Sequence, residues 1–497
     1  MYDLKDFEIR NGVLIRYKGE GGEVTIPDGV KEIGGYYDDS KEKLWCGAFH
    51  ECKHVTAVRI PSSVKKICEY AFLDCKRLKS VNIPFGVKRI KNYTFSGCTK
   101  LASITIPDGV REIGEFAFCE CSSLLRVEIP ESVIKIGENA FGDCYRMRSI
   151  TLPSGLVKIE SGLLSGCSAL LSVSLPEKIE KIGDFAFLDC SALKTAKLPS
   201  ALKKIGLWAF RGCESLASVE IPASVTCIEN SFPYCASLAS IVVNGENPMY
   251  YSAGNCLIER AGKTVIAGSD NSVIPDDGSV TRISTGAFSG RCGLVSVCIP
   301  SSVTEIEPGA FDFCPSLASI EVQEGNPVYR SFQNCLINTA KKELILGCKT
   351  SVIPNDKSVT SIGSGAFLGC VGLHSMILPD AVTKIDAFAF SECTGLESVV
   401  LPEKLKKIGR EAFCGSGLVS VDLPARLMKI EGGAFSSCKR LEAVKIPSSV
   451  REIDMSAFMS CEALRDLYFS GSRDDWSYVM KKNARISRKV KIHFGCD

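Results

Sequence analysis

The sequence predicts a mostly β solenoid, in which short turns of the chain stack on one another. Eight prolines fall at an unbroken spacing of 23 residues, from Pro61 to Pro222. The residues between the prolines repeat as well, so that one turn reads IPSSVKKICEYAFLDCKRLKSVN. Because a single turn is too short to bury its own apolar side chains, the neighbouring turns must cover them.

Each turn carries a predicted strand and a predicted core. In Leu78–Ile83, branched residues alternate with polar ones, which points Val81 and Ile83 inward and leaves Ser80 and Asn82 on the open face. Pro84 ends this strand because proline has no N–H for the next ladder bond. We therefore expect a parallel sheet on one face and an irregular convex side opposite. The predicted core positions of one turn are Ile60, Val64, Ile67, Ala71, Phe72, Cys75, Leu78 and Val81.

The unit I-P-x-S-V-x-x-I-G-x-x-A-F-x-x-C-x-x-L-x-S-V resembles the BspA-like leucine-rich repeat family, and the likeness runs from about Val24 to Phe469. The string NPMYYSAGNCLI from Asn247, which recurs as NPVYRSFQNCLI from Asn326, is a second family feature. The resemblance implies a leucine-rich repeat solenoid, an α/β-type right-handed superhelix that is mostly β. It also implies a binding or adhesion scaffold rather than an enzyme, with a protein, extracellular-matrix or host-surface ligand.

The repeat favours one quasi-linear domain with capped ends. We expect an N-terminal cap hairpin and first strand in residues 1–30, with the hairpin itself between Gly12 and Val30. The solenoid would occupy residues 31–469, with hairpin inserts at about 244–274 and 323–353. A C-terminal cap is expected in residues 470–497, where Ser472 and Asp475 form a capping box that predicts a short helix.

Charge and cysteine content narrow the classes of partner and compartment. The net charge of +2 argues against nucleic acid as a partner.

A basic residue precedes the isoleucine of many turns, and stacking would align these residues into a basic stripe. We interpret this basic stripe as a solvated row neutralised by carboxylates such as Glu115 and Asp386, with polyanion binding as the alternative. Fourteen of the 25 cysteines, from Cys52 to Cys461, share one repeat position and are expected to be buried free thiols. In one turn Arg291 takes that position.

The usual signatures of catalysis are absent from the sequence. With four histidines and no G-x-S-x-G, Walker or H-E-x-x-H string, we expect no catalytic residues, no cofactor and no enzyme activity. Cys46, His50 and His54 gather near Cys52 and are the candidates for a metal site. Since Cys52 belongs to the buried cysteine position and the histidines flank it, we expect no metal there.

The candidate ligand-binding residues lie in the insertion YYDDSKEKLWC, which enters between Ile33 and Ala48. Tyr36, Tyr37 and Trp45 are large aromatic residues in an otherwise polar segment, a composition typical of interface anchors. The alternative is that Trp45 folds back over the N-terminal core.

Three functions remain open from the sequence. The first is a non-enzymatic interaction or adhesion scaffold, the second an intracellular structural or assembly protein, and the third an enzyme with a site in the inserts. No signal peptide or membrane span is visible, so the chain as it stands predicts a cytoplasmic monomer. A secreted or cell-surface protein is the alternative.

Overall fold

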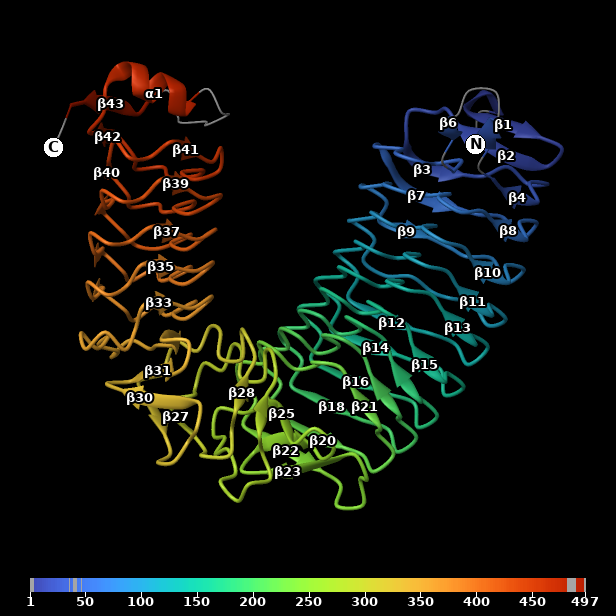
Figure 1. Ribbon diagram of the computed structural model, residues 1–497. Helices are drawn as coiled ribbons and strands as arrows, with labels where there is room; N and C mark the ends of the chain where they lie inside the picture. The colour runs from blue at the N-terminus through green and yellow to red at the C-terminus, as the bar shows by residue number, and fades with distance from the viewer. Residues whose placement is uncertain (1–3, 35, 39–42, 46, 481–488, 496–497) are drawn as a thin grey trace. The chain divides into compact units, whose positions relative to one another are not determined.

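The computed structural model describes residues 4–34, 36–38, 43–45, 47–480 and 489–495. The chain forms two compact units, Met1–Tyr251 and Ser252–Asp497. The same repeat runs through both, and most turns contribute two short strands, which pair in parallel with strands of neighbouring turns (Figure 1). The mostly β, parallel solenoid predicted from the sequence is confirmed.

The first set of strands forms the predicted open face, called here the open-face ladder. The alternation is as expected, since Val81 and Ile83 are buried whereas Ser80 and Asn82 are exposed. In the first unit its strands are β3 (Gly22–Thr25), β7 (Val55–Arg59), β9 (Ser80–Val81), β12 (Arg126–Glu128), β14 (Ser149–Thr151), β16 (Ser172–Ser174), β18 (Thr195–Lys197), β20 (Ser218–Ile221) and β22 (Ser240–Val243). In the second unit they are β27 (Ser296–Ile299), β29 (Ser319–Val322), β34 (Ser375–Ile377), β36 (Ser398–Val400), β38 (Ser420–Asp422), β40 (Ala443–Ile446), β42 (Asp466–Phe469) and β43 (Lys491–Phe494).

The second set, the isoleucine ladder, was not predicted, because the far side of each turn was expected to be irregular. Its two-residue strands each end in an isoleucine and pair in register, as Lys181–Lys204 and Ile182–Ile205 do. In the first unit they are β4 (Glu32–Ile33), β8 (Lys66–Ile67), β10 (Arg89–Ile90), β11 (Glu112–Ile113), β13 (Lys135–Ile136), β15 (Lys158–Ile159), β17 (Lys181–Ile182), β19 (Lys204–Ile205) and β21 (Cys227–Ile228). In the second they are β26 (Arg282–Ile283), β28 (Glu305–Ile306), β33 (Ser361–Ile362), β35 (Lys384–Ile385), β37 (Lys407–Ile408), β39 (Lys429–Ile430) and β41 (Glu452–Ile453).

The N-terminal cap differs from the sequence-based expectation. The hairpin joins β1 (Phe7–Arg10) to β2 (Val13–Tyr17) through Asn11 and Gly12, whose φ angles of 50° and 77° suit a two-residue hairpin turn. β2 then enters the isoleucine ladder beside β4, while β3 pairs with β7 in the other ladder. The expectation of a hairpin between Gly12 and Val30 is therefore wrong. A 3₁₀ turn, Leu4–Asp6, precedes β1.

The C-terminal segment contains the only helix in the described part of the chain, α1 (Arg473–Met480). As the capping box predicts, the Ser472 hydroxyl accepts a hydrogen bond from the Asp475 N–H at 3.2 Å, and Asp475 bonds back to the Ser472 N–H at 3.1 Å. Trp476 is buried, with its ring 5.1 Å from that of Phe469. The helix thus covers the last layer of the core.

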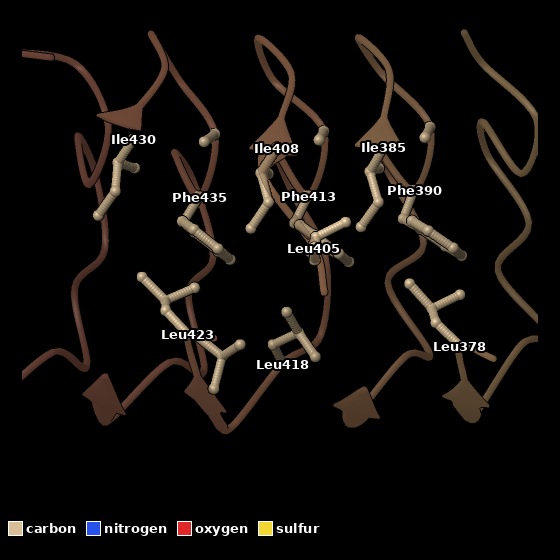
Figure 2. Close-up of a cluster of buried hydrophobic side chains, with 14 of the residues drawn as sticks. Leu378, Ile385, Phe390, Leu405, Ile408, Phe413, Leu418, Leu423, Ile430 and Phe435 are labelled. Atoms are coloured by element: carbon tan, nitrogen blue, oxygen red, sulfur yellow. The ribbon is translucent and has the colours of Figure 1, made fainter. Parts of the chain in front are cut away.

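Stacked side chains of one type fill the core between the ladders. All eight predicted core positions of the Ile60–Asn82 turn are buried. The phenylalanines stack face to face, with ring centroids of Phe72 and Phe95 5.2 Å apart and those of Phe95 and Phe118 5.3 Å apart. Figure 2 shows the same order in the second unit, where Ile385, Ile408 and Ile430 lie in one row and Phe390, Phe413 and Phe435 in another. Each turn therefore presents the next with a matching surface.

The recurrent cysteine also has a structural explanation. Its thiol donates a hydrogen bond to a phenylalanine carbonyl of the preceding turn, as Cys98 does to Phe72 at 3.2 Å and Cys121 to Phe95 at 3.3 Å. The position suits a small residue that can still satisfy a buried carbonyl. All 23 cysteines among the described residues are free thiols.

Two insertions carry the N-P-x-Y string. The first includes β23 (Tyr250–Ala253), β24 (Cys256–Glu259) and β25 (Thr264–Gly268), and the second β30 (Tyr329–Phe332), β31 (Cys335–Asn338) and β32 (Glu343–Leu346). The Asn326 side chain donates to the Pro300 and Val303 carbonyls, at 2.8 and 2.9 Å. The Tyr329 hydroxyl accepts from the Ile306 N–H at 3.0 Å. Asn247 and Tyr250 make the same hydrogen bonds in the first unit. The motif therefore supplies partners for backbone groups of the preceding turn, which has no regular turn after it.

The basic stripe is largely neutralised by carboxylates. Glu112 lies between Arg89 and Lys135, at 3.4 and 3.3 Å from their nitrogens. Of the carboxylates named from the sequence, Asp386 pairs with Lys384 at 2.7 Å. Elsewhere the partners are acidic residues of the isoleucine ladder, such as Glu32 and Glu452, or acidic residues directly after its strands, such as Glu160. The arrangement matches an ordinary mixed-charge surface.

Candidate interaction surface

One of the repeat positions with left-handed backbone recurs in nearly all turns and forms a column along each unit. It immediately precedes the Ala-Phe pair. In the first unit the column, with its φ angles, is Gly47 (22°), Tyr70 (60°), Tyr93 (56°), Phe116 (54°), Asn139 (52°), Gly162 (63°), Phe185 (58°), Trp208 (53°) and Asn230 (37°). Glycine and asparagine are the residues that adopt this conformation readily, whereas bulky aromatic residues do so rarely.

Aromatic residues nevertheless occupy three successive places. The ring centroids of Tyr70 and Tyr93 are 5.2 Å apart, and those of Tyr93 and Phe116 are 4.8 Å apart, with the rings nearly parallel. All three side chains are half-buried, so their edges reach solvent. We call Tyr70, Tyr93 and Phe116 the aromatic corner.

The backbone does not explain the choice of residue at this corner. A left-handed conformation costs a non-glycine residue about 1–2 kcal/mol, and stacking returns about 0.5–1.5 kcal/mol for each pair. For three residues and two stacked pairs, the cost of about 3–6 kcal/mol exceeds the return of about 1–3 kcal/mol, so stacking alone does not offset the strain. Strain of this kind, kept where a cheaper residue is available, is a feature of binding sites.

The chain returns from the predicted ligand-binding insertion beside the same corner, at Gly47. Its described backbone forms a two-stranded antiparallel hairpin of β5 (Tyr36–Asp38) and β6 (Lys43–Trp45), in which Tyr36 pairs with Trp45. The column starts at Gly47, where a Cβ would come within 1.9 Å of the Tyr70 carbonyl oxygen. Gly47, two residues after β6, therefore lies next to Tyr70.

A second aromatic group lies further along the same column. The rings of Phe185 and Trp208 meet edge to face, 5.9 Å apart. The Arg211 guanidinium lies 5.1 Å from the Trp208 ring centre and 4.8 Å from that of Tyr234. Trp208 is 37% exposed. Tryptophan, tyrosine and arginine are the residues that dominate the energetics of protein interfaces.

The candidate metal ligands are not brought together as a set. Cys46 lies outside the described residues. Cys52 is half-buried in its core position, and burial raises the pKa of its thiol to about 11, which disfavours the thiolate that zinc requires. Among the described residues, one group has metal-binding spacing: His50, Glu51 and Asp74, whose ligand atoms lie within 4.8 Å of one another. Asp74 is also 3.6 Å from the Lys76 ammonium group.

The aromatic corner was not predicted from the sequence, although the open face and the insertion were. A signal for it was present. The residue before the Ala-Phe or Thr-Phe pair is Tyr70, Tyr93 and Phe116 in three successive turns, whereas the same position elsewhere mixes Gly and Asn with single aromatic residues such as Phe185 and Trp208. The conformational meaning of that position, however, depends on a φ angle that the sequence does not display.

The repeat profile described as "BspA type Leucine rich repeat region (6 copies)" matches residues 42–171, 158–257, 269–357 and 360–478. The chain belongs to the BspA-type leucine-rich repeat family. Family membership supports a repeat protein that interacts with other proteins. A search of curated protein sequences finds no match.

Solved structures similar to this chain are leucine-rich repeat proteins. One from Bacteroides ovatus is 24% identical, with 98% of this chain and 97% of that chain covered and a TM-score of 0.47. A leucine rich cell surface protein from Faecalibacterium prausnitzii is 25% identical, covering 95% of each chain with a TM-score of 0.41. The Pneumococcal vaccine antigen PcpA is 16% identical over 97% of this chain and 86% of that chain, with a TM-score of 0.41.

None of the described helices is long and apolar enough to cross a membrane.

Proposed function

We propose that this BspA-type repeat protein is a non-catalytic scaffold that binds another protein through the aromatic corner. The observation that carries the proposal is the left-handed backbone of Tyr70, Tyr93 and Phe116, which keep large, partly exposed rings where Asn139 and Gly162 occupy the same column. Rings that the fold does not require, and that reach solvent in a continuous row, suit a partner's apolar side chains.

The insertion is part of the same proposed surface. Tyr36, Tyr37 and Trp45 lie in β5 and β6, and β6 ends two residues before the column begins. A partner that covers Tyr70 would therefore come close to this hairpin. The alternative is that the partner binds the hairpin alone and does not contact the aromatic corner.

The finer proposal is adhesion, in which the partner is an extracellular-matrix or host-surface protein, as family membership suggests. The alternative is an intracellular structural or assembly role. Fractionation of the native cells separates the two: adhesion requires the protein in the medium or at the surface, whereas assembly requires it in the cytosol. Catalysis in the inserts has less support, because Asn326 and Tyr329 bond to the backbone of the preceding turn.

The test replaces Tyr93 by asparagine, the residue that the column has at position 139. Immobilised wild-type protein is used to capture partner proteins, and the yield of each is compared with that of Tyr93→Asn. We expect at least a tenfold loss of the specific partner, while the free energy of unfolding changes by less than about 1 kcal/mol, because asparagine accepts the left-handed conformation.

Phe388→Asn provides the matched control. Phe388 has the same backbone, with a φ of 59°, and is 37% exposed, but it lies in the second unit. Its substitution should leave capture unchanged. Equal capture by wild type and Tyr93→Asn, or equal losses in both variants, would contradict the proposed surface.

A further inference from the structure

The side of the first unit that carries the open-face ladder has an excess of basic residues. In five successive turns, the seven residues after the core cysteine are 53–59, 76–82, 99–105, 122–128 and 145–151, and they include β7, β9, β12 and β14. These segments hold one acidic residue, Glu128. All of their basic residues are exposed, and these are Lys53, Arg59, Lys76, Arg77, Lys79, Lys100, Arg126, Arg146 and Arg148. We call the five segments the basic face.

The five segments lie side by side along the unit. Hydrogen bonds of 2.8 to 3.3 Å to backbone carbonyls join each turn to the one before it, from Lys79 to Thr56, Thr99 to Lys76, Ser122 to Thr99 and Arg148 to Leu125. Neighbouring parallel strands are about 4.8 Å apart. The basic face therefore presents at least one cation at each step of that length.

Few of these cations have a carboxylate partner within the chain. Among the described residues, the one ion pair made from the basic face joins Lys76 to Asp74 at 3.6 Å. The basic stripe of the isoleucine ladder differs, since Glu112 there lies between Arg89 and Lys135. Acidic residues border the basic face at the position before the core cysteine, namely Glu51, Asp74, Glu120 and Asp143. They leave most of the cations available to an external anion.

The repeat does not require this distribution of charge. In the stretches between the five segments, residues 60–75, 83–98, 106–121 and 129–144, seven basic residues are outnumbered by nine acidic ones. The second unit offers the same positions after its core cysteines, in residues 315–321, 371–377, 394–400, 439–445 and 462–468. These hold four basic and five acidic residues. The positive charge is therefore a property of the basic face and not of the fold.

We propose that the basic face binds a sulfated polysaccharide. A long chain of sulfate groups can contact the cations of all five turns at once, and it releases its own counterions when it does so. Hydroxyl groups lie among the cations, since Ser80, Ser103 and Ser149 are exposed, and these can donate hydrogen bonds to sulfate and sugar oxygens. The inference is independent of the partner proposed for the aromatic corner.

The composition of the basic face favours a polysaccharide over the other polyanionic or protein partners. Lysine, serine and alanine are depleted at protein interfaces, whereas they are frequent here, as in Lys79 and Ser80 or Ala102 and Ser103. Single-stranded nucleic acids stack their bases on several aromatic side chains. Tyr145 is the one tyrosine, tryptophan or phenylalanine in the five segments.

The test measures the binding of heparin to the intact protein, with chemically desulfated heparin of the same length as the control ligand. We expect heparin to bind and its affinity to fall as the salt concentration rises, whereas desulfated heparin should bind much more weakly. The double variant Arg126→Ser, Arg148→Ala introduces the side chains that Ser149 and Ala102 have at the same positions of nearby turns. It should weaken heparin binding by about tenfold.

The control variant Lys404→Ala, Lys406→Thr removes the same charge from exposed positions of the second unit and should bind heparin as wild type does. Circular dichroism spectra identical to wild type establish that both variants are folded. Equal losses in the two variants would reduce the effect to net charge and contradict the proposed surface. Equal binding of desulfated heparin would remove the role of sulfate. Tighter binding of a DNA duplex than of heparin would make the basic face a nucleic-acid surface instead.

Discussion

Individual residues in this repeat are chosen for backbone conformation and for hydrogen bonds to the next turn as much as for apolar burial. The cysteine position illustrates this. Burial raises the pKa of the Cys121 thiol well above its usual value, and the thiol donates to the Phe95 carbonyl. Cys298 differs, because it is exposed on β27. Reactivity should therefore follow position in the repeat.

Native alkylation measures this difference. At pH 8, iodoacetamide should modify Cys298 at least tenfold faster than Cys121, as measured by mass spectrometry of timed samples. Denatured protein provides the control, since both thiols should then react at similar rates. Rapid modification of Cys121 in the native state would show that its layer of the core is open.

Asp312 is the residue whose ionisation should affect stability most clearly. Its pKa is raised from an ordinary value near 3.8 to about 6 in the folded protein, so folding disfavours its charged form. The destabilisation is absent below the unfolded pKa and complete above the folded one. Asp312→Asn should thus raise the free energy of unfolding by about 1–3 kcal/mol at pH 7.5, and the gain should vanish near pH 4. Urea unfolding at both pH values would measure it; a gain that is the same at both would contradict the assignment.

At the scale of elements, the N-P-x-Y string completes a turn that has no regular successor. Tyr329→Phe removes the acceptor of the Ile306 N–H. Leaving this half-buried donor without its partner should lower the free energy of unfolding by about 1 kcal/mol. Tyr468→Phe, on the open-face ladder, is the control and should change it by less than about 0.5 kcal/mol. Equal effects in the two variants would mean that the hydroxyl of Tyr329 has no special role.

Strands and helices could be predicted from the sequence where a single turn displays their pattern of apolar and polar residues or their capping residues. The alternation around Val81 predicted the open-face ladder, and Ser472 with Asp475 predicted α1. The isoleucine ladder escaped because a two-residue strand such as Lys66–Ile67 has no alternation to detect. The N-terminal hairpin was misplaced because the Gly-rich stretch at Gly19–Gly22 was taken for its turn, whereas Asn11 and Gly12 supply the positive φ angles.

At the scale of the whole molecule, the repeat determines the fold. We expect partner binding at positions where the sequence departs from the repeat. The aromatic corner is the place in the first unit where three successive turns put stacked rings in a column that elsewhere mixes Gly and Asn with Phe185 and Trp208. The insertion at Tyr36–Trp45 was found from the sequence because it breaks the 23-residue spacing. The aromatic corner was not predicted, because its character depends on φ angles that the sequence does not display.

Hydrogen–deuterium exchange of the protein alone and with its captured partner tests the central claim, that the partner binds at the aromatic corner. Binding should slow exchange in peptides that contain Tyr70, Tyr93 and Phe116 and in the insertion at residues 36–45. Peptides from the open-face ladder and from the turn of Phe388 should exchange as before. Protection confined to the open-face strands, with none at Tyr70, Tyr93 and Phe116, would contradict the account.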